Sequence, residues 1–62
     1  MSELLTVDQL AERLGVSPNW VRDHARGSRR PHIPALKLGG AWRFRWEAIE
    51  AWLKELEERR VA

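Results

Sequence analysis

Two helix starts lie close together near the N-terminus, and they constrain the fold more than any other feature of the sequence. Thr6 is followed three residues later by Gln9, which is the spacing of a reciprocal capping box. Ser17 and Pro18 supply a second N-cap and a proline at the first helical position, where its missing N–H costs nothing. Gly15 lies between the two starts, where the end of a helix favours a left-handed residue. The sequence therefore predicts two short helices joined by a tight turn.

The two predicted helices cover residues 7–14 and 18–26, and their sequences are suited to packing against each other. Ala11 is small where the helices would cross, and Val21 is the core anchor of the second helix. The tight turn lets the first helix brace the second across the backbone of a duplex. Residues 6–26 are therefore a helix-turn-helix candidate.

The rest of the chain predicts a loop, a hairpin and a third helix. Residues 27–34 contain two prolines, a glycine and two arginines, which is typical of an irregular, basic loop. In residues 35–45, apolar and basic side chains alternate on both sides of Gly39-Gly40, a pair that favours a primed hairpin turn. Residues 46–58 place an apolar stripe along one side of a helix. The predicted fold class is α+β, mostly α: a winged helix-turn-helix with three helices and a two-stranded β-hairpin wing.

Length and composition exclude several classes of protein. The 62 residues are enough for one domain, expected to span 1–62. The absence of cysteine excludes disulfides and thiolate zinc sites, and it favours a reducing, cytoplasmic environment. No apolar run approaches the length that spans a bilayer, so we expect no membrane partner. Because the chain also lacks a nucleophile elbow, a phosphate loop and metal-ligand spacing, we expect neither an enzyme nor a cofactor.

Charge is distributed unevenly along the chain. The segment from Trp20 to Trp46 carries a net charge of +6, whereas the remaining residues together carry −4. A basic centre framed by acidic ends suits a polyanion held at one face, such as nucleic acid. The alternative is an ordinary solvated surface of arginines.

The exposed side of the second helix is the expected DNA-reading surface. If Val21 and Ala25 face the core, polar side chains that suit major-groove contacts lie on the opposite side, where Asn can pair with adenine and Arg with guanine. The expected contacts are Ser17, Asn19, Trp20, Arg22, Asp23 and Arg26. The alternatives are a solvated helix face and, for Trp20, packing against a neighbouring element.

The loop and the hairpin add a second expected set of DNA contacts. Gly39-Gly40 would let the backbone approach a phosphate, while Lys37 and Arg43 would reach along a groove. The expected contacts are Arg29, Arg30, Lys37, Gly39, Gly40 and Arg43.

The chain resembles the excisionase-type winged-helix DNA-binding domains, which are related to the MerR regulators. The resemblance lies in LLTVDQLAERLGVSPNWVR and in IPALKLGGAWRF followed by IEAWL, roughly residues 4 to 56. It implies a recognition helix in the major groove, a wing on adjacent phosphates or the minor groove, and often cooperative, DNA-bending assembly on repeated sites. The recognition positions of the family fall on Asn19, Arg22, Asp23 and Arg26, and its wing positions on Lys37, Gly40 and Arg43.

Three positions depart from the pattern of that family. His24 stands where the family prefers an aliphatic residue, which we expect to loosen the core. Arg45 replaces the usual helix-capping Asp or Ser. The loop between Arg26 and Pro34 is longer and more basic, which would enlarge the contact with phosphates.

The expected function is that of an excisionase, a recombination directionality factor that binds and bends DNA beside an attachment site to direct excision by an integrase. Its expected partners are double-stranded DNA, a site-specific integrase and further copies of itself on DNA, in a bacterial or phage-infected cell. Regulators of the MerR class append a long dimerisation helix and an effector domain, and the chain ends too soon for either. Two alternatives stay open: a small MerR-like transcriptional regulator, and a protein-docking module that uses the acidic C-terminal helix.

Overall fold

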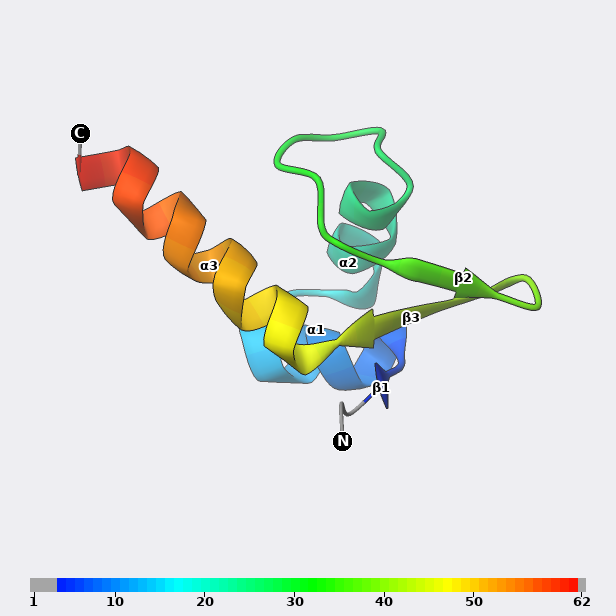
Figure 1. Ribbon diagram of the computed structural model, residues 1–62. Coiled ribbons are helices and arrows are strands. Elements are labelled where there is room, and N and C mark those ends of the chain that lie inside the picture. The colour runs from blue at the N-terminus through cyan, green and yellow to red at the C-terminus, as the bar shows by residue number, and fades with distance from the viewer. Residues whose placement is uncertain (1–3, 62) are drawn as a thin grey trace.

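The computed structural model describes residues 4–61, with side chains described through residue 59, and contains three helices and three strands (Figure 1). In chain order they are β1 (Leu4–Leu5), α1 (Val7–Leu14), α2 (Pro18–Ala25), β2 (Leu36–Leu38), β3 (Ala41–Arg45) and α3 (Trp46–Val61). Helix α1 packs against α2, β1 and β3, and strand β3 contacts both other strands, α1 and α3. No helix among the described residues is long and apolar enough to cross a membrane.

Side-chain caps set the starts of α1 and α2, and a glycine ends α1, as the sequence predicts. Helix α2 ends at Ala25, one residue before the predicted end, and Arg26 is its C-cap residue. The Thr6 hydroxyl accepts a hydrogen bond from the backbone N–H of Gln9 at 3.2 Å, and the Gln9 side chain accepts one from the backbone N–H of Thr6 at 2.9 Å. Gly15 ends α1 in the left-handed conformation, with φ of 73°. The Ser17 hydroxyl then accepts from the backbone N–H of Trp20 at 3.1 Å and starts α2. Each cap satisfies a backbone donor that has no partner inside its own helix.

The sheet has three strands, one more than the sequence predicts. Strand β3 lies in the middle and pairs antiparallel with both β1 and β2. The predicted hairpin of β2 and β3 is present, and both Gly39 and Gly40 have positive φ, 54° and 84°, as a primed turn of type I′ requires. The additional strand β1 consists of Leu4 and Leu5 only. Two residues cannot show the alternation of polar and apolar side chains by which a strand is predicted.

The two faces of the sheet have different compositions because the turn of two residues sets the register. Leu5 lies opposite Phe44 on the inner face, and both side chains are buried. Leu36 lies opposite Arg43 on the other face. This outer sheet face carries Leu4, Leu36, Leu38, Ala41, Arg43 and Arg45. The leucines and arginines of the hairpin therefore share a face, and the hairpin does not separate apolar from basic residues.

The core is built from both halves of the chain. Its buried members are Leu5, Leu10, Ala11, Val21, Ile33, Phe44 and Ile49. The four tryptophans are half-buried and surround this centre. Trp46 is also covered by the Arg13 guanidinium, which lies 4.8 Å from the ring centroid and connects α1 to α3. The tryptophans thus add apolar area at the margin of the core.

Helix α3 extends to Val61, three residues further than the sequence predicts. It begins immediately where β3 ends, so Arg45 is the last residue of the strand and Trp46 the first of the helix. An ion pair of 2.8 Å joins Arg59, which lies beyond the predicted end of the helix, to Glu55. A pair in which the acid precedes the base by four residues stabilises an exposed helix by about 0.2–0.5 kcal/mol.

Candidate nucleic-acid interface

Helix α2 turns one face to the core and the opposite face to solvent. Val21 is fully buried and His24 nearly so, whereas Asn19, Arg22 and Arg26 are exposed and Asp23 is half-buried. Four of the residues expected to contact DNA therefore lie together on the solvent side of one helix. Ser17 is exposed at the start of that helix, where its side chain serves as the N-cap.

The polar side chains of this face are paired with one another. Arg22 donates from Nη1 to Asn19 Oδ1 at 3.2 Å. Arg26 donates from Nη2 to Asp23 Oδ1 at 2.8 Å, and the two side chains are 63% and 35% exposed. Each arginine thus has an acceptor three residues before it on the same helix. Exposed contacts such as the Arg26–Asp23 ion pair stabilise a fold little.

Trp20 packs against the protein. Its indole stacks on the His24 imidazole, with ring centroids 3.8 Å apart and 19° between the planes. His24 Nδ1 lies 2.7 Å from the carbonyl oxygen of Trp20 and donates to it, because a carbonyl oxygen only accepts. The expectation that His24 loosens the core is not supported, since the buried ring has both a stacking partner and a hydrogen bond.

The basic loop over residues 27–34 is tied back to the end of α2. The backbone N–H of Ser28 donates to the carbonyl oxygen of Asp23 at 3.1 Å, and that of Ile33 donates to the carbonyl oxygen of His24 at 3.2 Å. Ile33 is buried in the core, which anchors the far end of the loop. Arg29 and Arg30 are exposed between these two anchors. The loop therefore extends the positive charge of α2 beyond its C-terminus.

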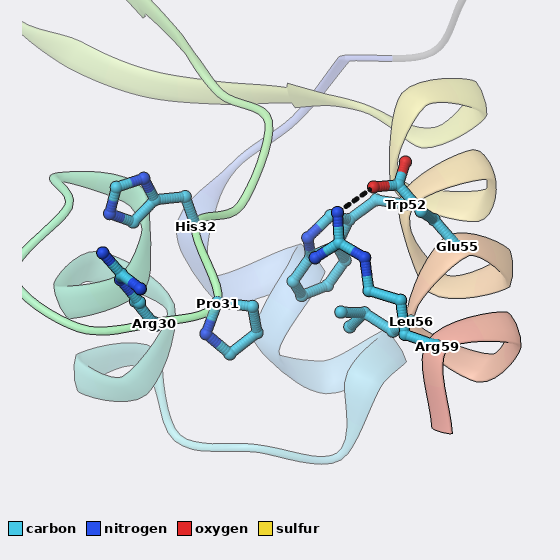
Figure 2. Close-up of a pocket in the computed structure, with 7 residues that line it drawn as sticks. All are labelled: Arg30, Pro31, His32, Trp52, Glu55, Leu56 and Arg59. Atoms are coloured by element: carbon cyan, nitrogen blue, oxygen red, sulfur yellow. Dashed lines mark hydrogen bonds and ion pairs between the residues drawn. The ribbon is translucent and has the colours of Figure 1, made fainter. Parts of the chain in front are cut away.

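An open groove, which the sequence does not predict, separates this loop from α3. Figure 2 shows Arg30, Pro31 and His32 on one wall and Trp52, Glu55, Leu56 and Arg59 on the other. Arg59 is paired with Glu55, so the groove presents charges of both signs beside the apolar side chains of Trp52 and Leu56. It could be recognised only once the loop was known to fold back beside α3.

The hairpin projects away from the helices, with Gly39-Gly40 at its exposed tip (Figure 1). Lys37 lies on the inner face, where its ammonium is 4.8 Å from the centroid of the Trp42 ring. Arg43 lies on the outer face and donates to the Trp42 carbonyl oxygen at 2.7 Å. The structure therefore does not bring Lys37 and Arg43 to one side of the wing.

This combination of a capped helix-turn-helix, a basic outward face on its second helix and a projecting hairpin defines a winged helix-turn-helix DNA-binding domain. The sequence pattern of the helix-turn-helix domain family matches residues 4–57, and the chain belongs to that family. No curated protein and no solved structure matches the chain.

Proposed function

We propose that this DNA-binding domain is an excisionase-type recombination directionality factor. It binds duplex DNA beside an attachment site, bends it, and thereby directs a site-specific integrase toward excision. The protein acts in the cytoplasm of a bacterial or phage-infected cell and changes the shape of DNA without chemistry of its own.

The observation that carries the proposal is that the domain has two separate places for contact with DNA: the exposed arginines of α2 and its loop, and a hairpin that projects away from the helices (Figure 1). A helix in the major groove and a wing on neighbouring phosphates contact the duplex at two places. A protein that holds two places on one duplex repays the cost of bending it with the additional contacts. The resemblance of the wing and α3 to excisionase-type domains points to the same use.

The proposed roles of the residues follow from their positions. The solvent face of α2 reads base edges through Arg22 and Arg26. Arg29 and Arg30 neutralise phosphates next to that helix, and the hairpin tip at Gly39-Gly40 lets the backbone approach the sugar-phosphate chain. Several copies on adjacent sites would extend the bend.

A mobility-shift titration at two salt concentrations tests the proposal. The probe is the DNA that flanks the gene and any neighbouring attachment site, with scrambled DNA as competitor. A stepwise, salt-sensitive ladder that prefers the natural DNA is the expected result. A single shifted species would favour a simple transcriptional regulator, and no shift at low salt would favour protein docking through the acidic α3.

A matched variant separates DNA binding from docking. Glu57 is exposed on α3, which is acidic, whereas the proposed interface is basic. Glu57→Gln should leave the affinity for DNA unchanged or slightly raised, because it removes a negative charge from a protein that binds phosphates. A loss of DNA affinity in this variant would count against the proposed interface.

A further inference from the structure

We propose that Asn19 and Asp23 are positioning residues that hold Arg22 and Arg26 for guanine, so that the target site contains two guanines on adjacent base pairs or one base pair apart. This inference rests on the proposed role of α2 in reading DNA. It assigns to two polar residues of the helix a role other than direct contact with bases.

The same contact occurs twice along α2 and its C-cap residue. Asn19 accepts a hydrogen bond from Arg22 at 3.2 Å, and Asp23 accepts one from Arg26 at 2.8 Å. In both cases the acceptor precedes its arginine by three residues, which places the two side chains on the same side of the helix. Two successive turns of α2 therefore present the same unit, an acceptor followed by an arginine.

Arg26 keeps enough N–H donors for DNA while it is held by its neighbours. A guanidinium group has five N–H donors in a rigid fork, and a bidentate contact with guanine O6 and N7 needs two of them. Arg26 uses Nη2 toward Asp23 and Nε toward the Ser28 hydroxyl, at 3.4 Å. The hydrogens of Nη1 and the second hydrogen of Nη2 remain for a contact with DNA. Arg26 is thus held through one edge of its guanidinium group, and the two terminal nitrogens can still donate to guanine O6 and N7.

The side chains of Asn19 and Asp23 are turned toward the two arginines, which makes them less suited to reading bases themselves. Reading adenine requires an asparagine to accept from N6 and donate to N7 with the same amide group. In this structure the Asn19 oxygen already accepts from Arg22. The Asp23 carboxylate is likewise paired, and its charge is compensated by Arg26 where an isolated carboxylate would repel the phosphates.

The spacing of the two arginines sets the spacing of the guanines. Positions four apart on a helix are separated by about 6 Å along its axis. In zinc fingers, helix residues three apart contact successive bases. The two arginines therefore reach base pairs that are neighbours or have one pair between them.

Selection of binding sites from a random duplex library tests the proposal, followed by titrations in which each selected guanine is replaced by 7-deazaguanine, which lacks the N7 acceptor. We expect the wild type to select two such guanines and to lose about 5- to 150-fold in affinity for each replacement. Asp23→Ala should reduce the preference for one guanine alone, and Asn19→Ala the preference for the other alone. Asn19→Asp keeps an acceptor and should retain both preferences.

Arg29→Ala is the matched control, because it removes an exposed arginine from the loop and should weaken all sequences alike. Thermal unfolding of the Ala variants should match the wild type, since the changed side chains are at the surface. The inference is overturned if the selected binding sites do not contain two guanines at this spacing. It is also overturned if Asn19→Ala loses a preference for adenine. Failure of the wild type to bind any duplex would instead overturn the proposed function itself.

Discussion

Truncation of Phe44 to alanine should remove a large part of the stability of this domain. Phe44 lies on β3, in the middle of the sheet, with its side chain completely buried. It faces Leu5 across the β1–β3 pair and belongs to the same core as Leu10 and Ile49. No other buried side chain of the described residues is larger. Phe44→Ala therefore leaves a cavity where both halves of the chain meet.

The expected magnitude follows from the size of the side chain and of the domain. Replacing a buried phenylalanine by alanine costs about 3–5 kcal/mol. A chain of 62 residues has a free energy of unfolding of roughly 3–9 kcal/mol, at 0.05–0.15 kcal/mol per residue. Each kcal/mol lowers the melting temperature of so small a domain by about 4–8 °C, so Phe44→Ala should lower it by at least about 12 °C.

Thermal and urea unfolding followed by circular dichroism measure this change, and Leu38→Ala is the matched control. Leu38 belongs to the same hairpin but lies on the outer sheet face, where it is 50% exposed. Its truncation should change the free energy of unfolding by no more than about 0.5 kcal/mol. Similar losses in the two variants would refute the strand register, because a slip by one residue exchanges the two faces of a strand.

Three further predictions concern the caps, the turn and the charge. Thr6→Ala removes the acceptor of the capping box and should lower the free energy of unfolding, measured by urea titration, by about 1 kcal/mol. Thr6→Ser keeps the hydroxyl and should change it little, so equal losses in the two variants would contradict the cap. Gly40→Val places a branched side chain at a φ of 84° and should cost about 1–2 kcal/mol, more than Gly40→Asn, by thermal unfolding; a valine variant as stable as the asparagine variant would contradict the turn. With about five or six basic side chains on phosphates, fluorescence anisotropy should give a slope near −5 for log affinity against log salt, and a slope shallower than about −2 would argue against so large an interface.

The helices were predictable from the sequence because their ends are encoded by adjacent residues. Each of these signals acts within one turn of the helix: the capping box of Thr6 and Gln9, the left-handed Gly15, and the N-cap Ser17 followed by Pro18. The structure begins both helices and ends α1 at these residues. The hairpin turn is encoded in the same local way. The faces of the strands could also have been deduced, because a turn of two residues requires residue 38 to lie opposite residue 41 and residue 36 opposite residue 43.

Contacts between distant segments could not be predicted in this way. Strand β1 exists only because β3 offers Leu5 a partner, and two residues carry no periodicity of their own. The burial of His24 depends on the stacking of Trp20 and on the return of the loop, whose Ile33 binds the His24 carbonyl oxygen. The pairing of Arg22 with Asn19 is local, yet it is one of several arrangements open to exposed side chains. The sequence therefore predicts which residues of α2 face outward, and the structure adds which of them contact one another.

The position of β1 also determines when Leu5 can be buried during synthesis. Leu5 is made before its partner Phe44, which lies much further along the chain. At about 5–20 residues per second, seconds pass after the synthesis of β1 before β3 has been added. During that interval α1 and α2 can pair through local contacts, which form quickly, whereas the contact of Leu5 with Phe44 joins residues that are far apart in the sequence. A chain truncated before β3 would therefore contain both helices of the DNA-reading unit and still leave Leu5 without the strand that buries it.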